Sequence, residues 1–338
     1  MPRTASPTAS TKKPTETPCE HWRIGAHLSA AGALSVAIEE GVALRFGAVQ
    51  IFTRNQRQWT TKPLAEDEIA AFTAARAGTV FTDGTRLVSH NSYLVNLASP
   101  DPTNRAKSLD CERAELERCE QLGILTSVAH PGAHLCGEGG TPRKPKDPND
   151  LESEPTADEL AGLKRIAASI DQLHRDLKGY KVRIALETTT GSGTNLGYAF
   201  HHLGLIRSMV KAPERVAFCI DTCHVYAAGY AVATAVQAKA TLERFDAEAG
   251  LSAVAAIHMN DSEGAFASRK DLHAHIGEGG CGEAWFRAVL RNPAFALVPK
   301  VLETEKGEDA KGILWDRLNA DRLARLAGSA LSRACGTT

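Results

Sequence analysis

The chain has 338 residues, of which 43% are apolar and 23% are charged, and its formal net charge is −1. This composition is typical of a globular protein and excludes a largely disordered chain, and no apolar run reaches the roughly 18 residues of a membrane-spanning helix. Without a global positive field, the protein needs a local patch or bound cations to attract an anionic partner.

The first element in chain order is a polar tail. Residues 1–20 are rich in Ser, Thr, Pro and Lys and contain little to bury, so we expect them to be disordered. A second polar stretch, 137–158, predicts a long loop insertion. We find no fixed repeat and no other shift in composition, so the sequence predicts one folded domain over 21–335.

Short apolar runs alternate with longer stretches of helical periodicity, which is typical of parallel strands joined by helices. We expect eight strands, at 23–29, 48–53, 86–91, 126–132, 182–188, 216–222, 254–260 and 300–304. Helices are expected between them, for example at 32–44, 64–77, 103–121, 157–176, 199–211 and 283–291. Eight such units predict an α/β fold, a (β/α)8 TIM barrel.

Each expected strand ends in a residue that can bind a metal or a substrate: His27, Gln50 or Thr53, His90, His130, Glu187, Asp221, His258 and Glu303. Barrel enzymes build their active sites at this end of the strands. A single histidine there is more often a hydrogen-bonded structural residue than a ligand. Six consecutive strands that end in histidine or carboxylate favour a functional site.

Three more candidates follow the strands: His224, Asp271 and His273. Asp271 and His273 are two residues apart, so in extended backbone their side chains point the same way, and with His224 they can form a further site at the barrel mouth. Histidine with carboxylate, and no cysteine, favours Zn²⁺ or Mn²⁺. The six residues that end the last six strands, from His90 to Glu303, and these three make nine candidate ligands. Nine exceed the needs of one ion, so we expect a metal cluster, and a carboxylate such as Glu187 can bridge two ions.

The eight cysteines include no C-x-x-C pair, and no apolar signal segment is present. We therefore expect reduced, mostly buried thiols and a cytoplasmic protein, associated with the nucleoid only through DNA.

Nine motifs carry a resemblance that spans about Ile24 to Glu303: GAHLSAAG, IFTRNQRQW, HNSYLVNL, HPGAH, ALETTTGSGTNLG, CIDTCHVYAAGY, HMND, SRKDLHAHIGEG and LET. In this order they resemble endonuclease IV, a family of metal-dependent apurinic/apyrimidinic (AP) endonucleases of base excision repair with a xylose-isomerase-like barrel. Each motif is weak alone, but nine in family order are specific.

The resemblance implies three Zn²⁺ ions, with Mn²⁺ possible at one or more sites. Glu187 would bridge two ions and is the expected catalytic residue, His90 and His130 would complete the first site, and Asp221, His258 and Glu303 the second. The third ion would be held by His224, Asp271 and His273.

The implied reaction is hydrolysis of the phosphodiester 5′ to an abasic site in duplex DNA, which leaves a 3′-hydroxyl and a 5′-deoxyribose phosphate. Metal coordination lowers the pKa of a bound water towards about 7 and supplies the nucleophile. The family also implies a monomer, and DNA contacts by Arg57, Gln58 and Tyr93.

This chain departs from the family pattern at two positions. Thr188 stands where the family usually has Asn, and Ala133 where it has Ser. Neither is an expected ligand, so we expect catalysis to survive. The RKPK stretch at 143–146, within the insertion, is a candidate for contacts with DNA phosphates, and a solvated excursion is an equally good interpretation.

Two other functions remain open. A divalent-metal sugar isomerase or epimerase shares the fold and places similar side chains around two ions, but has no evident use for His224, Asp271 and His273 or for the Arg57 loop. A non-catalytic DNA-damage-binding zinc protein is the second alternative, and the absence of cysteine ligands argues against it.

Overall fold

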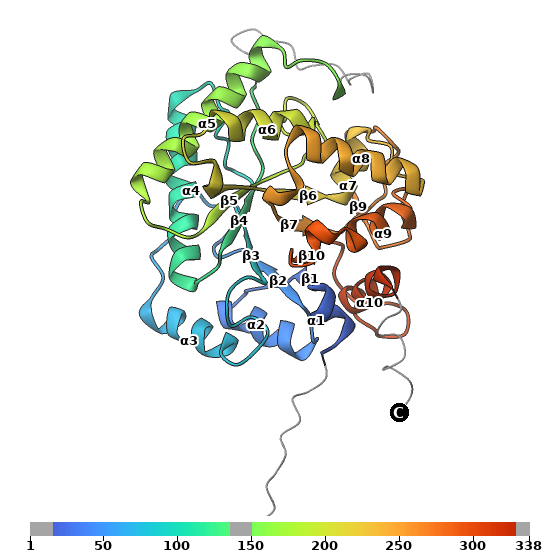
Figure 1. Ribbon diagram of the computed structural model, residues 1–338. Helices are drawn as coiled ribbons and strands as arrows, with labels where there is room; N and C mark the ends of the chain where they lie inside the picture. The colour runs from blue at the N-terminus through green and yellow to red at the C-terminus, as the bar shows by residue number, and fades with distance from the viewer. Residues whose placement is uncertain (1–15, 136–150, 329–338) are drawn as a thin grey trace, which may run out of the picture.

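The computed structural model describes residues 16–135 and 151–328, which form a closed barrel of parallel strands surrounded by helices (Figure 1). The order around the barrel is β1-β10-β7-β6-β5-β4-β3-β2. All eight expected strands are confirmed: β1 Ile24–His27, β2 Ala48–Ile51, β3 Leu87–His90, β4 Thr126–Ala129, β5 Arg183–Glu187, β6 Val216–Asp221, β7 Val254–His258 and β10 Lys300–Leu302.

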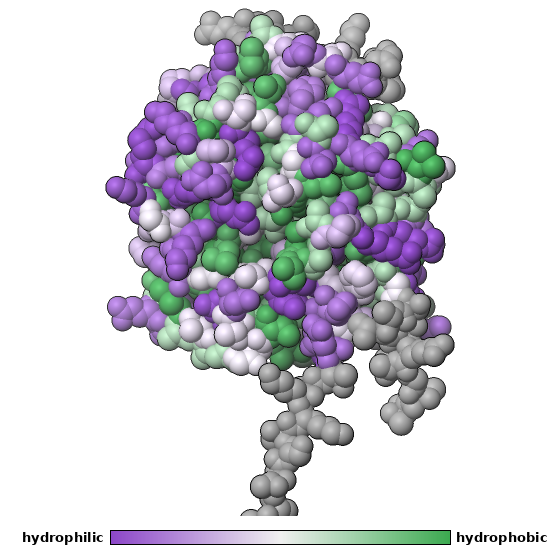
Figure 2. Space-filling view, viewed as in Figure 1, coloured by the Kyte–Doolittle hydropathy of each residue, from purple (hydrophilic) through white to green (hydrophobic). Residues whose placement is uncertain are grey.

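All six expected helices are present, with ends that move by two residues or fewer: α2 Leu34–Ala43, α3 Glu66–Arg76, α4 Pro102–Leu122, α5 Ala157–Asp176, α6 Phe200–Met209 and α9 Glu283–Arg291. The described residues add helices outside the expected ranges: α1 Pro18–Trp22, α7 Thr222–Ala228, α8 Ala235–Glu248 and α10 Trp315–Ala327. In Figure 2, hydrophilic residues gather around the periphery of the molecule and apolar ones show towards its centre. Within the described ranges, we find no helix with the length and apolar character needed to cross a bilayer.

The interior of the barrel is lined by small apolar side chains that alternate with residues facing the helices. Ala48, Val88, Val128, Ala185 and Cys219 belong to this inner cluster. Each of the first four lies two residues before a polar residue at the end of its strand, so the polar side chains point along the same inward face. Because of this alternation, the polar side chains at the strand ends all point inward at one mouth of the barrel.

The expectation of a disordered tail through residue 20 is wrong at its C-terminal end. Thr17 caps α1, and its side chain and that of Glu20 form a reciprocal capping box. Cys19 is buried in the core, which anchors the segment. Residues 1–15 lie outside the described residues.

The expected loop over 137–158 is also packed at its C-terminal end. Leu151 is buried, and its carbonyl oxygen accepts a hydrogen bond from Arg244. Thr156 caps α5 through a capping box with Glu159. The rest of the insertion, with the RKPK stretch at 143–146, lies outside the described residues.

Candidate metal centre

Six of the nine candidate ligands lie at or directly after strand ends. His90, Glu187, Asp221 and His258 are the last residues of β3, β5, β6 and β7, and His130 and Glu303 follow β4 and β10 by one residue. Because all strands are parallel, their carboxyl ends meet at one mouth of the barrel. The structure brings these six side chains together there.

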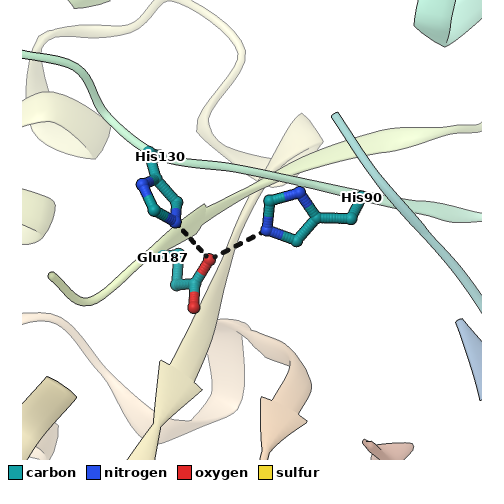
Figure 3. A group of neighbouring side chains, drawn as sticks. All are labelled: His90, His130 and Glu187. Carbon is teal, nitrogen blue, oxygen red and sulfur yellow. Dashed lines mark hydrogen bonds and ion pairs between the residues drawn. The ribbon is translucent and has the colours of Figure 1, made fainter. Parts of the chain in front are cut away.

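Glu187 lies at the centre of the constellation and is 1% exposed. Its Oε2 atom is 3.3 Å from His90 Nε2 and 3.2 Å from His130 Nε2, which defines the His130 group: His90, His130 and Glu187 (Figure 3). Its other oxygen, Oε1, is 2.8 Å from His258 Nδ1. The two oxygens of Glu187 thus face different partners, as a bridging carboxylate requires.

A second set, the Asp221 group, consists of Glu187, Asp221, His258 and Glu303, whose ligand atoms lie within 4.8 Å of one another. His258 Nδ1 is 3.1 Å from Glu303 Oε2 and 3.8 Å from Asp221 Oδ2. One imidazole nitrogen therefore faces three carboxylates, which is a chemically suitable setting for a divalent cation.

The third set, the Asp271 group, consists of His224, Asp271 and His273 and is built from a helix and a loop. Asp221 caps α7 by accepting a 2.8 Å hydrogen bond from the backbone N–H of His224, which fixes the position of that histidine. Asp271 Oδ1 lies 3.0 Å from His224 Nε2 and 3.2 Å from His273 Nε2. His273 begins β9 (His273–Ala274), which pairs with β8 (Asp261–Ser262).

These distances fit a metal centre. Zinc binds nitrogen and oxygen ligands at about 2.0–2.2 Å, so two ligands of a tetrahedral ion are about 3.3 Å apart. Among the residues that the structure describes, His224 Nε2 and His273 Nε2 are buried and make no hydrogen bond, although both face Asp271. A cation placed between these atoms would satisfy both nitrogens.

The charges of the site reinforce one another. Burial raises the pKa of Glu187, but the neighbouring His258 and His130 outweigh burial and hold that pKa well below its usual value. Burial lowers the pKa of His273, but Asp221 and Asp271 outweigh it and raise the pKa to about 9. The carboxyl group of Glu187 is therefore ionised, as cation binding requires, and a cation bound at the Asp271 group would have to displace the proton that His273 carries at neutral pH.

Several buried polar residues that were not expected support these side chains. Asn260 donates a 2.7 Å hydrogen bond to Asp221 Oδ2 and accepts one of 2.8 Å from the backbone N–H of Glu303. The backbone carbonyl oxygen of Asn91 lies 2.8 Å from His90 Nδ1, and the side-chain amide of Asn91 donates to Glu112 of α4. Neighbouring polar residues that fix ligand orientation are typical of metal sites.

The sequence offered two candidate site residues at the end of β2, Gln50 and Thr53, and the structure gives them different roles. Gln50 contacts Glu303 and His258 inside the barrel. The hydroxyl of Thr53 instead donates to Glu115 on α4 at 2.9 Å. Gln50 therefore belongs to the site. Thr53 instead connects the start of the loop after β2 to the surrounding layer of helices.

The loop that carries Asp271 also contains ligand-type residues with structural roles. Asp261 accepts hydrogen bonds from the backbone N–H groups of Ser262, Gly277 and Cys281, at 2.9 Å each. The ring of His275 stacks on Trp315 with centroids 3.8 Å apart. These residues shape the loop and leave Asp271 and His273 to face His224.

The three candidate DNA-contact residues lie on loops at the same mouth. Arg57 and Gln58 are exposed, and Tyr93 is 62% exposed. The ring of Tyr93 lies 5.4 Å from that of His90 and 5.8 Å from that of Phe52. An aromatic rim thus borders the His130 group.

Known proteins resemble this chain over most of its length. Residues 38–324 match the family model for xylose isomerase-like TIM barrels. The chain is 40% identical over 304 residues to a probable endonuclease 4 of Chloroflexus aggregans, which covers 90% of this chain and 97% of that protein. It is 38% identical over 303 residues to a probable endonuclease 4 of Geobacter sulfurreducens, covering 90% and 94%.

Solved structures also resemble this chain. The crystal structure of endonuclease IV from Thermus thermophilus matches with a TM-score of 0.71 and 30% identity, covering 90% of this chain and 98% of that one. A D-tagatose 3-epimerase-like protein matches with a TM-score of 0.62 and 16% identity, covering 93% and 100%. The second likeness shows the fold alone.

Proposed function

The chain belongs to the endonuclease IV family of xylose isomerase-like TIM barrels, and from this premise we propose that it is a zinc-dependent AP endonuclease acting on duplex DNA. It hydrolyses the phosphodiester on the 5′ side of an abasic site and leaves a 3′-hydroxyl and a 5′-deoxyribose phosphate.

One observation carries the proposal: nine side chains from distant parts of the chain converge at one mouth of the barrel as three sets of potential ligands, two of which share Glu187. The two Glu187 oxygens serve the His130 group and the Asp221 group, and the Asp271 group lies beside them. Two linked sites and a third adjacent one suit the displacement of an alcohol from a phosphodiester.

Metal ions bound by the three groups would supply the chemistry of the proposed reaction. Ions held there would neutralise the phosphate, lower the pKa of the attacking water and stabilise charge on the leaving oxygen. Glu187 fixes the spacing between the first two sites, because both of its oxygens are engaged. Asp271 is 48% exposed, so the third site is the one most open to the approaching DNA.

The rim residues supply the proposed contacts with DNA. Arg57 offers a charged planar group for phosphates or bases, and Tyr93 offers a stacking face beside His90. Opening a duplex costs less free energy where a base is missing, which favours abasic sites over intact ones.

All nine proposed ligands come from one chain, so the site is complete without a second subunit. We propose that the active form is a monomer. Sedimentation of the active protein checks this, and a dimer that loses activity on dissociation would contradict it.

The decisive experiment is to incubate the purified protein with a duplex that contains one abasic site and to identify the product termini. We expect a 3′-hydroxyl and a 5′-deoxyribose phosphate, and no cleavage of the matched intact duplex. An unsaturated aldehyde at the 3′ end would identify a lyase. Isomerisation of a ketose together with two bound ions per chain would instead support the sugar isomerase alternative.

A further inference from the structure

Gln50 occupies an inward position on β2. It is fully buried, and in the parallel register of β1 and β2 it pairs with His27. It follows Ala48 of the inner cluster by two residues, so its side chain points into the barrel, beneath the mouth.

The amide of Gln50 contacts three residues that lie on, or directly after, three other strands. Its Nε2 atom lies 2.6 Å from Glu303 Oε1 and 3.0 Å from His27 Nδ1. Its Oε1 atom lies 2.8 Å from His258 Nε2. Both ends of one neutral side chain are therefore occupied by members or neighbours of the Asp221 group.

The chemistry of these contacts fixes the orientation of the amide. Glu303 is a carboxylate and can only accept, so the NH₂ group must face it, and the amide oxygen must then face His258. An oxygen cannot donate, so the hydrogen of this bond belongs to His258 Nε2. In the neutral imidazole, the form that binds a metal, the lone pair of His258 consequently lies on Nδ1, the atom that faces Glu187, Asp221 and Glu303.

We propose that Gln50 is a positioning residue of the Asp221 group: it fixes His258 in the tautomer whose Nδ1 binds the metal, and it holds Glu303 so that Oε2 remains available to the same ion. This inference rests on the proposed function, because it takes the Asp221 group to bind a divalent cation. A ligand histidine that donates its second ring nitrogen to a neighbouring oxygen is held in tautomer and in ring orientation.

A neutral amide suits this position better than other polar side chains. A carboxylate at residue 50 would face Glu303 at the 2.6 Å that Nε2 now occupies, and the two negative charges would repel each other. An apolar side chain would leave both Glu303 Oε1 and His258 Nε2 without this buried partner.

Two variants test the proposal by different routes. Gln50→Met removes both contacts at similar volume, and Gln50→Glu keeps an oxygen towards His258 but loses the N–H donor towards Glu303. The matched control is Lys300→Met. Lys300 is equally buried on β10, where it donates to the carbonyl oxygens of Phe295 and Val298 at 2.7 and 2.9 Å, away from the proposed ligands.

The readout is metal binding, not turnover. Metal-free protein is titrated with Zn²⁺ against a competing chelator, and with Co²⁺ while the visible absorption reports the ligand geometry. We expect both Gln50 variants to bind one ion about 10- to 100-fold more weakly than the wild type and to lose one component of the Co²⁺ spectrum. Lys300→Met should bind all ions as the wild type does.

The outcomes separate the inference from its premise. Wild-type affinities and spectra in both Gln50 variants would overturn the role of Gln50, and so would an equal loss in Lys300→Met. If Gln50→Met does not fold, the nearly isosteric Gln50→Glu decides the question alone. A wild-type protein that binds no divalent ion would overturn the proposed function itself.

Discussion

The strand ends and the α7–β9 region contribute to the same mouth in different ways. Glu187, Asp221 and His258 end their strands and are 1%, 0% and 0% exposed. In the Asp271 group, by contrast, Asp271 lies on a loop and is 48% exposed, and His273 is 17% exposed. The rigid barrel therefore holds the shared pair of sites, and a more accessible loop adds the third.

Because Glu187 belongs to both buried sites, we expect its substitution to cause the largest loss of nicking activity. Glu187→Gln should lower nicking of an abasic duplex by at least about 10³-fold, because an amide offers one oxygen where both the His130 group and the Asp221 group need one. The shape of the side chain is kept, so circular dichroism should show a folded barrel. Turnover at the wild-type rate would reject the bridging role.

Asp271→Asn should have a smaller effect, a loss of about 10²-fold in kcat, because it disturbs only the Asp271 group. Metal analysis should find one ion fewer per chain, with the other two retained. The matched control is Glu263→Gln, which removes an exposed carboxylate from the same loop. This variant should change neither kcat nor the number of ions per chain. Loss of all ions in Asp271→Asn would contradict the independence of the two regions.

Mild chelation should separate the regions without mutation. The exposed Asp271 group should release its ion first, since the other two sites lie beneath it among residues that are mostly buried. Metal content and nicking, measured together over time, should show a protein with two ions per chain and about the residual activity of Asp271→Asn before the remaining metal is lost. Simultaneous release of every ion would contradict the expected difference between the exposed Asp271 group and the two buried sites.

The same contrast explains what the sequence revealed. Strand ends were predictable because alternation in a buried strand has a period of two, so small residues such as Ala185 and a polar end such as Glu187 share one face. The pair Asp271 and His273 was predictable from its spacing. In α1, the T-x-x-E pattern from Thr17 to Glu20 was an available capping signal that the polar composition of the tail obscured.

The hydrogen bonds that support the proposed ligands could not be predicted from the sequence, because they depend on which helix packs behind which strand. Alternation alone did not say whether Gln50 or Thr53 faces the axis, since the inward face of a strand buried on both sides is not marked by polarity. The pairing of Asn91 with Glu112, 21 residues away on α4, required the packed helix layer.

Thr188 joins the two regions and should show an intermediate effect. Its hydroxyl oxygen accepts a 2.9 Å hydrogen bond from the backbone N–H of Asp221, and its carbonyl oxygen lies 2.8 Å from His224 Nδ1. Thr188→Val removes only the first contact and should lower kcat about tenfold, whereas Thr188→Ser keeps the hydroxyl and should stay within about twofold. Equal activity of the two variants would show that the hydroxyl does not position Asp221.

Arg57 lies outside both regions, and its effect should be the smallest and of a different kind. The side chain is exposed and contacts no proposed ligand in the described structure, so Arg57→Ala should leave kcat unchanged and raise KM by several-fold. If the guanidinium neutralises a phosphate, the slope of log affinity against log salt should also fall by about one. Arg57→Lys keeps the charge and should keep that slope, while any part of the KM increase that persists in this variant reports the loss of planar stacking. A change in kcat with an unchanged salt slope would place Arg57 in the chemistry of the centre and not in the binding of DNA at its rim.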